Sequence, residues 1–251
     1  MAPGSSNSSD LAPPPSLGDI DRPSLFLDFD GTLVDLAETP DGITVPDYLE
    51  AAIMRLAERL DGRLAIVTGR YVADLRKHLP QCSVVISGSH GAEIESPEGS
   101  PVSGKEPPRV DEALLAEARA FAQRHERLFL EEKELGLGFH YRACPDKGED
   151  VKAFAQDLAR RHDLFFRDGK MIAELSTTDD NKGDGVRAIM EQTPFKGGTP
   201  IFVGDDVTDE DGFAAVDAMG GYAIVVGDRE ETKARFRLFG VRAVHQWLEL
   251  E

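Results

Sequence analysis

A short apolar segment that ends in two closely spaced aspartates constrains this chain most. Residues 24–33 read S-L-F-L-D-F-D-G-T-L, and the apolar residues 25–27 predict a buried strand. Side chains alternate along a strand, so Asp28 and Asp30 lie on the same side of it, and Gly31 permits a sharp turn. Ligands of open α/β sheets bind at the carboxyl ends of strands, where paired acids favour Mg²⁺. Taken alone, the segment also fits a solvated aspartate turn.

Three later segments strengthen the first interpretation. Residues 64–70 read L-A-I-V-T-G-R, residues 181–183 read N-K-G ahead of a helical pattern, and residues 201–210 read I-F-V-G-D-D-V-T-D-E. In this order the four segments resemble the motif set of the haloacid-dehalogenase superfamily of phosphohydrolases. The resemblance implies an α/β fold with a Rossmann-like parallel-sheet core.

Composition and charge exclude several classes of partner. The chain has 251 residues and a formal net charge of −18, which disfavours nucleic acid and anionic membranes because both need clustered Lys and Arg. No apolar stretch approaches the ~20 residues of a membrane span, and the N-terminus lacks the pattern of a signal peptide. Cys82 and Cys144 are too few for a disulfide framework. We therefore expect a cytoplasmic protein with two reduced thiols, and a monomer.

The pattern of apolar residues divides the chain into four stretches. Residues 1–22 are rich in Ser, Pro, Ala and Gly, which predicts disorder. Residues 23–106 and 179–251 alternate apolar runs with helical periodicity, as a parallel α/β sheet does. Residues 107–178 instead predict a helix followed by two short strands, twice over. This stretch is predicted to be an α+β cap domain of two α-β-β repeats, inserted into the core.

Hydrolysis of a phosphate ester needs a nucleophile, a proton donor and positive charge near the phosphoryl oxygens. Asp28 is the candidate nucleophile, and Asp30 is the candidate acid for the leaving oxygen and base for the attacking water. We expect Mg²⁺ to be held by Asp28, the backbone carbonyl of Asp30 and Asp205. Asp206 and Asp209 are expected to complete the metal site by orienting its waters.

Three further residues are candidates for binding the phosphate. Thr68 can donate its hydroxyl, Gly69 can bring a backbone N–H close, and Lys182 lies at a predicted helix N-terminus that already favours an anion. Each also has a purely structural interpretation, since Thr68 could cap a helix and Lys182 could be a surface lysine.

Motifs outside the core set narrow the resemblance to one family. Residues 204–210 read G-D-D-V-T-D-E and resemble the G-D-D-x-T-D-E form of trehalose-6-phosphate phosphatases. Residues 87–93, 130–133 and 140–142 are similar to that family's G-x-H-G-A-E, L-E-x-K and H-Y-R motifs. The resemblance implies Mg²⁺-dependent hydrolysis of a phosphorylated disaccharide, trehalose 6-phosphate, through an aspartyl-phosphate. It also implies that five cap residues contact the sugar or hold a closed cap: Glu131, Lys133, His140, Arg142 and Glu174.

One departure from the family leaves alternatives open. The glutamate at the position of Glu174 is commonly followed, one position on, by a basic residue and proline, where this chain has Ser176 and Thr177. A phosphatase of sucrose 6-phosphate or of a glycosylglycerate phosphate is therefore the main alternative. Glu131 and Lys133 could instead form an exposed strand pair of little energetic worth, and His140 could simply pack. A receiver-type signalling domain would share the strand-end Asp, Mg²⁺, Thr and Lys, but it conflicts with Asp30 and with the inserted domain.

Overall fold

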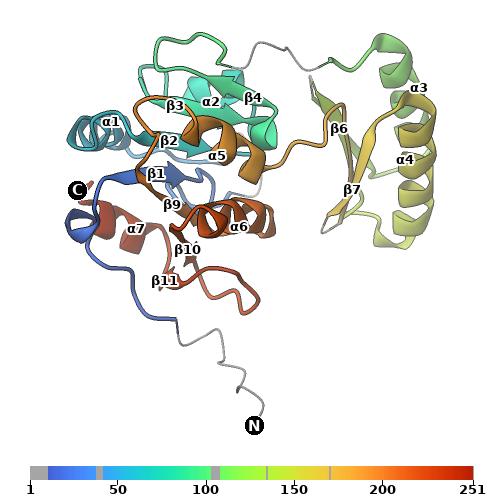
Figure 1. The fold of residues 1–251 in the computed structure, drawn as a ribbon. Helices are drawn as coiled ribbons and strands as arrows, with labels where there is room; N and C mark the ends of the chain where they lie inside the picture. Colours follow the sequence, from blue (N-terminus) through green and yellow to red (C-terminus); the bar gives the residue numbers. More distant parts are fainter. Residues whose placement is uncertain (1–10, 38–41, 103–107, 134, 170, 251) are drawn as a thin grey trace. The chain divides into compact units, whose positions relative to one another are not determined.

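The computed structural model describes residues 11–37, 42–102, 108–133, 135–169 and 171–250. The chain forms two compact units (Figure 1). Unit 1 combines Met1–Gly104 with Asp180–Glu251, and unit 2 is Lys105–Asp179. Unit 2 is thus an insertion between two stretches of unit 1.

Unit 1 is built on a sheet whose described strands run in the order β11-β10-β9-β1-β2-β3-β4. Neighbouring strands are parallel except for β3 and β4, which are antiparallel. The predicted α/β fold with a parallel-sheet core is confirmed. The strands are β1 (Pro23–Leu27), β2 (Leu64–Val67), β3 (Val85–Gly88), β4 (Glu93–Glu95), β9 (Thr199–Gly204), β10 (Tyr222–Val226) and β11 (Phe236–Leu238).

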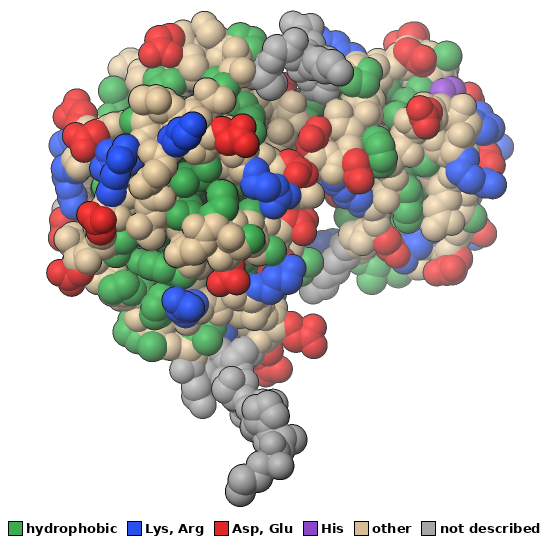
Figure 2. All heavy atoms as spheres, viewed as in Figure 1, with side chains coloured by type: hydrophobic (Ala, Val, Ile, Leu, Met, Phe, Trp, Pro, Cys, Tyr) green, Lys and Arg blue, Asp and Glu red, His purple; other side chains and the backbone are tan. Residues whose placement is uncertain are grey.

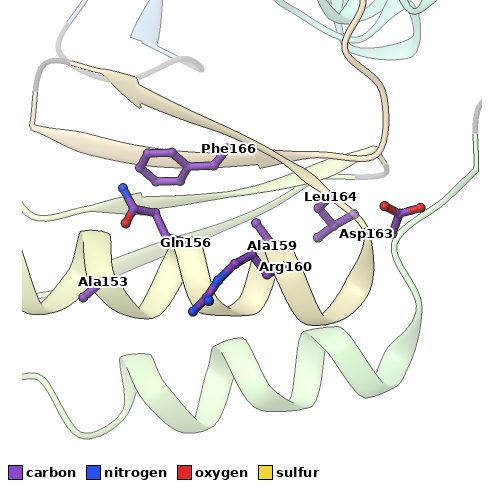
Figure 3. Close-up of a pocket in the computed structure, with 7 residues that line it drawn as sticks. All are labelled: Ala153, Gln156, Ala159, Arg160, Asp163, Leu164 and Phe166. Atoms are coloured by element: carbon purple, nitrogen blue, oxygen red, sulfur yellow. The ribbon is translucent and has the colours of Figure 1, made fainter.

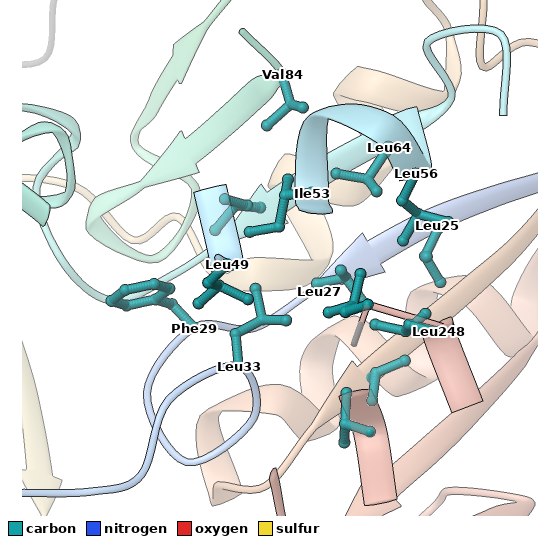
Figure 4. Close-up of a cluster of buried hydrophobic side chains, with 14 of the residues drawn as sticks. Leu25, Leu27, Phe29, Leu33, Leu49, Ile53, Leu56, Leu64, Val84 and Leu248 are labelled. Atoms are coloured by element: carbon teal, nitrogen blue, oxygen red, sulfur yellow. The ribbon is translucent and has the colours of Figure 1, made fainter. Parts of the chain in front are cut away.

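Helices cover both faces of this sheet, and every residue of the central strands β1 and β2 is buried. The helices are α1 (Leu49–Arg59), α2 (Val72–His78), α5 (Lys182–Met190), α6 (Glu210–Ala218) and α7 (Val241–Leu248). In β1, Leu25 and Leu27 pack into the cluster under α1, α2 and α7 (Figure 4), whereas Phe26 packs into the cluster under α5 and α6. Each fully buried side chain of this size contributes about 1.5–3 kcal/mol to the free energy of unfolding. The central strand is thus fixed from both sides.

The stretch just before β1 differs from the predicted disorder of residues 1–22. Leu17, in a 3₁₀ turn at Leu17–Asp19, is 5% exposed and packs into the cluster under α7. The Trp247 indole N–H donates to the Pro15 carbonyl at 2.8 Å, and the Arg237 N–H donates to the Ala12 carbonyl at 3.1 Å. Composition predicted disorder, but Leu17 and one aromatic partner hold the stretch in place. Residues 1–10 lie outside the described residues.

Unit 2 contains the predicted pattern of a helix and two strands, twice over. Its strands form an antiparallel sheet in the order β5-β6-β8-β7. One face packs in an apolar cluster with both helices, including the stacked rings of Phe121 and Phe154. The other face carries polar side chains together with the exposed rings of Phe129 and Phe165. The elements are α3 (Glu112–Ala122), β5 (Phe129–Lys133), β6 (Gly136–His140), α4 (Gly148–His162), β7 (Phe165–Gly169) and β8 (Ile172–Ser176).

The surface agrees with the charge of the sequence. On the face drawn in Figure 2, acidic and basic side chains are interspersed, and no broad basic patch appears among the coloured residues. Nor does any helix of the described residues combine the length and the apolar character needed to span a bilayer. The absence of a broad basic patch on this face fits the net charge of −18.

Candidate active site

The carboxyl ends of three neighbouring strands bring the predicted motifs of unit 1 together. Asp28 directly follows β1, Thr68 follows β2 and Asp205 follows β9. Because β9, β1 and β2 are parallel neighbours, their carboxyl ends lie at the same edge of the sheet. Lys182 is the first residue of α5 and reaches this edge through its side chain.

Lys182 forms a buried bridge between two carboxylates. Its Nζ donates to Asp28 Oδ1 at 2.7 Å and to Asp209 Oδ1 at 2.6 Å. The three side chains are at most 5% exposed. Burial disfavours the charged ammonium, but the two carboxylates outweigh it and hold the pKa of Lys182 above its ordinary value. Lys182 is therefore a fixed cation beside Asp28.

Three carboxyl groups crowd around this one cation. Asp28, Asp205 and Asp209 each offer an oxygen, and these atoms lie within 4.8 Å of one another. Burial, together with the charge of Asp209, raises the pKa of Asp28 well above its ordinary value, which Lys182 only partly offsets. The same two causes raise the pKa of Asp205 from 3.8 to about 6, although a hydrogen bond to Asp28 works against them. Excess negative charge of this kind suits a divalent metal ion.

Gly31 explains how the turn after β1 can approach the loop after β9. Its φ is +80°, and a Cβ at this position would lie 2.2 Å from Asp205 Oδ2. Thr32, in the same turn, donates its hydroxyl to Asp205 Oδ1 at 3.4 Å. A side chain at residue 31 would therefore displace Asp205. The glycine of the first motif thus leaves the space that the Asp205 carboxylate of the last motif occupies.

Asp206 is not one of the three clustered carboxylates, and its predicted part in orienting metal-bound waters stays a prediction. It is exposed, and its side chain takes part in a capping box that accepts the backbone N–H of Asp209. Asp209 is the residue that turns inward, with its side chain fully buried. In D-D-V-T-D the capping turn sends the second acid outward and the third inward, and strand periodicity cannot predict this.

Asp30 faces a partner that the sequence did not single out. The Arg70 guanidinium donates from Nε to Asp30 Oδ2 at 2.6 Å and from Nη2 to Oδ1 at 2.7 Å. Burial works against the charge of Arg70, but the hydrogen bonds to Asp30 prevail and raise its pKa. Arg70 directly follows the predicted phosphate residues Thr68 and Gly69, so its position in the motif was a signal that could have identified it.

Thr68 and Gly69 lie at the turn between β2 and α2. The Thr68 hydroxyl oxygen accepts the Arg70 backbone N–H at 3.1 Å, which leaves the hydroxyl proton available for donation to a ligand. The His90 ring packs against Gly69, where a Cβ would lie 2.7 Å from the ring atom Nε2. His90, with a φ of +57°, is thus a second neighbour of the site that was not among the predicted site residues.

The turn at residues 88–91 links the second and third motifs. Gly91 has a φ of +108°, and a Cβ there would lie 2.4 Å from the backbone oxygen of Asn181. Asn181 caps α5 by accepting the N–H groups of Gly183 and Asp184, and Asp184 accepts the N–H of Asn181 in return. This capping box fixes the helix start, and with it the backbone of Lys182.

In unit 2, four of the five predicted sugar-contacting residues lie on the open face of the sheet. Lys133 Nζ is 3.1 Å from Glu174 Oε1 and 3.5 Å from Glu131 Oε2, and His140 Nε2 is 2.9 Å from the same Glu131 oxygen. The hydrogen bond from His140, with the charge of Lys133, holds the pKa of Glu131 below its ordinary value. We call Glu131, Lys133, His140 and Glu174 the polar cluster of unit 2.

Gly138 forms the floor of the polar cluster. It pairs with Glu131 on one side and with Glu174 on the other, so these side chains flank a position that has none.

Arg142, the fifth predicted residue, is exposed in the turn after β6, and no hydrogen bond or ion pair of the described residues joins it to the polar cluster. The sheet pairing thus brings four predicted residues together and leaves Arg142 outside.

A hollow elsewhere in unit 2 contains none of the predicted site residues. It lies between α4 and β7, with Phe166 over the helix (Figure 3). Its lining residues are Ala153, Gln156, Ala159, Arg160, Asp163, Leu164 and Phe166. The candidate chemistry lies in the carboxylate–lysine arrangement of unit 1 and not in this hollow.

Comparisons with known proteins point to one family. The family model described as trehalose-phosphatase matches residues 26–241. A probable trehalose-phosphate phosphatase of Sinorhizobium fredii is 38% identical over 211 residues, covering 83% of this chain and 79% of the relative. The trehalose-6-phosphate phosphatase of Escherichia coli is 32% identical over 226 residues, covering 90% of this chain and 85% of the relative.

Solved structures agree with this result. The structure of a trehalose-6-phosphate phosphatase related protein is 28% identical to this chain, with a TM-score of 0.76 and coverage of 90% of this chain and 95% of the other. The C-terminal domain of a trehalose-6-phosphate phosphatase from C. albicans shares the fold of this chain, with a TM-score of 0.73 and 22% sequence identity. The match covers 93% of this chain and 92% of the other. With a family model matched over most of its length, the chain belongs to the trehalose-phosphatase family and is a phosphoric monoester hydrolase.

Proposed function

We propose that this chain hydrolyses trehalose 6-phosphate to trehalose and phosphate through an aspartyl-phosphate on Asp28. The observation that carries the chemistry is the buried Lys182 bridge between Asp28 and Asp209 at the carboxyl end of β1, and the family match over residues 26–241 supports the substrate. Release of phosphate from a panel of sugar phosphates tests it, with trehalose 6-phosphate expected to be preferred by a large margin over glucose 6-phosphate. Preference for sucrose 6-phosphate would favour the alternative, and residues 176–177 would be the first to exchange.

Each residue of the site has a role in two displacement steps. Asp28 attacks phosphorus as Asp30 gives a proton to the leaving sugar oxygen, and Asp30 then takes a proton from the water that attacks the aspartyl-phosphate. Lys182 neutralises charge on Asp28 and on the phosphoryl oxygens, and Thr68 and Gly69 donate hydrogen bonds to those oxygens.

The acidic cluster fits a divalent metal ion because its negative charge is not balanced within the protein. Both oxygens of Asp209 are engaged, one by Lys182 and the other by the Asp206 N–H at 2.9 Å. Asp28, Asp205 and the backbone carbonyl of Asp30 would therefore hold Mg²⁺, and Asp209 would orient Lys182. When bound, Mg²⁺ offsets the charge of the phosphoryl oxygens and of the two carboxylates.

Metal removal is expected to abolish phosphate release, and Mg²⁺ is expected to restore it. Ca²⁺ should restore it poorly, because its larger and more flexible shell does not enforce the same geometry. A second readout is the unfolding midpoint in chelator, which Mg²⁺ should raise at pH 7. The rise should shrink below pH about 6, where Asp205 takes up a proton. Full activity in excess chelator would overturn the metal assignment.

We also propose that the polar cluster of unit 2 binds the hydroxyl groups of the sugar. Carboxylates and a fixed ammonium are suitable partners for hydroxyls, and a site built for them discriminates against analogues that lack them. Glu131, Lys133 and Glu174 are each about a quarter to a third exposed, so they are held by one another and still open to a ligand. The mutual bonds arrange the donors and acceptors before a sugar arrives.

Glu131→Gln is expected to lower kcat/KM for trehalose 6-phosphate by about ten- to a hundredfold. Loss of a hydrogen bond to a charged group costs roughly 1.5–3 kcal/mol. Hydrolysis of a small aryl phosphate, which has no sugar to bind, should change little. Kinetics with the two substrates measure this difference.

The neighbouring residue provides a matched control. Glu132 lies on the opposite face of the same strand, where Arg119 donates to both of its oxygens at 2.6–2.7 Å. Glu132→Gln should leave both substrates unaffected. Equal losses of Glu131→Gln on both substrates would mean that the polar cluster maintains structure and does not bind sugar. The contact of Arg142 with sugar, the monomeric state and the cytoplasmic location stay predictions.

A further inference from the structure

Arg70 holds the carboxylate of Asp30 by both oxygens. Its Nε lies 2.6 Å from Asp30 Oδ2 and its Nη2 lies 2.7 Å from Asp30 Oδ1, the parallel geometry that a planar guanidinium provides. A lysine could not reproduce this geometry, since an ammonium acts as a point charge. The orientation of Asp30 is therefore set by the orientation of Arg70.

Arg70 is itself fixed on the core. Its Nη1 lies 3.2 Å from Asp74 Oδ2 in the first turn of α2, and Lys77 Nζ lies 2.8 Å from the other Asp74 oxygen. The guanidinium carbon lies 5.9 Å from the centroid of the Phe29 ring. With a side chain only 8% exposed, Arg70 has little freedom to turn. The chain of contacts runs from α2 to the carboxylate of Asp30.

We propose that Arg70 is the positioning residue that orients Asp30 for proton transfer to the leaving sugar oxygen. The inference rests on the proposed function, which gives Asp30 its acid and base role. Asp30 enters this step with the proton that it took from the attacking water of the preceding turnover. As the Asp28 oxygen bonds to phosphorus, the bond from phosphorus to the sugar oxygen breaks, its electron pair stays on that oxygen, and the Asp30 proton moves there. The carboxylate that results is the form that Arg70 pairs with. Arg70 occupies one lone pair on each Asp30 oxygen and leaves another for the proton.

Without Arg70, the Asp30 carboxylate would lose the two hydrogen bonds that fix its orientation. Its side chain is 29% exposed and follows a strand end, so several staggered rotamers would become accessible. General acid catalysis requires the donor within hydrogen-bond reach of the leaving oxygen. A displacement of about 1 Å can cost roughly a hundredfold in rate.

The test compares a poor and a good leaving group in Arg70→Met. Trehalose leaves only with a proton, whereas dinitrophenolate leaves without one. In a single turnover, which isolates the first step, release of trehalose is expected to slow about a hundredfold. Release of dinitrophenolate from dinitrophenyl phosphate should slow less than about threefold. Equal losses on both substrates would overturn the proposal, because a cation acting on the phosphate itself serves both alike.

Three further variants separate the possible causes. Arg70→Lys retains the charge but not the paired geometry and should show the same selective loss; full recovery on both substrates would overturn the proposal. In an Asp30→Asn background, Arg70→Met should cost nothing more, and additive losses would overturn action through Asp30. Arg76→Met, which breaks a similar contact from α2 to Glu95 at 2.9 Å, should leave both rates unchanged. If Asp30→Asn slowed the release of trehalose more than that of dinitrophenolate and Arg70→Met did not, only the role of Arg70 would be refuted. If Asp30→Asn slowed both releases equally, the acid role of Asp30 in the proposed function would be refuted.

Discussion

Asp28→Asn is expected to lower kcat for trehalose 6-phosphate at least ~10³-fold, equivalent to about 4 kcal/mol of activation free energy. The amide retains the shape of the side chain but cannot form the aspartyl-phosphate. It also removes one of the acids that would hold Mg²⁺. Single-turnover phosphate release and a search for a phosphorylated protein intermediate measure the effect.

The fold of Asp28→Asn should stay intact, because Lys182 keeps its hydrogen bond to Asp209. A matched control is Asp217→Asn, the same isosteric change at an exposed position of α6, which should retain full activity. If Asp28→Asn kept more than about a tenth of the wild-type turnover, only ~1.4 kcal/mol of the barrier would depend on this carboxylate. Asp28 could not then be the nucleophile.

Lys182→Met is expected to reduce both activity and stability. It leaves Asp28, Asp205 and Asp209 crowded without their cation, and breaking a buried ion pair costs about 3–5 kcal/mol. For a chain of this length the unfolding midpoint should fall by roughly 10 °C in chelator. Calorimetry measures this, and Mg²⁺ should restore part of the loss by binding the same carboxylates.

The loss of stability in Lys182→Met should depend on pH in a defined direction. The pKa of Asp205 rises from 3.8 to about 6 on folding, so the native state binds more protons than the unfolded state in that range, and stability falls as pH rises through it. The difference between wild type and variant should therefore be largest above pH 6 and should narrow in acid. Lys152→Met, which removes a surface partner of Asp168, should shift the midpoint little at any pH. A pH-independent loss in Lys182→Met would instead indicate a packing defect.

The placement of the unit 1 motifs could be predicted because strand ends are marked in the sequence. Apolar runs at residues 25–27, 64–67 and 201–203 predict parallel strands, and the residues that follow such strands meet at one edge. The alternation of β5 also predicts that Glu131 and Lys133 share a face. Local periodicity and one rule of sheet topology are sufficient for these results.

What was missed depends on pairing, capping and side-chain contacts that strand and helix periodicity do not encode. Strand β11 is three residues long and includes an arginine, so its own sequence does not predict a strand. It is a strand because it pairs with β10. Asp206 and Asp209 were expected to act alike, but the capping turn between them leaves Asp206 exposed and buries Asp209. The contact between Asp30 and Arg70 joins side chains 40 positions apart, and no periodicity reports such a pair.

The position of the insertion has a consequence for how such proteins can diverge. Unit 2 ends at Asp179, and Asn181 begins the capping box that fixes the start of α5, two residues after the boundary. The backbone ahead of Lys182 is thus anchored by contacts within unit 1, including the close approach of Gly91 to Asn181. An inserted unit of different size or sequence could join at this boundary without moving the lysine. Selection can therefore exchange the inserted unit while the arrangement of Lys182 and its carboxylates is inherited unchanged.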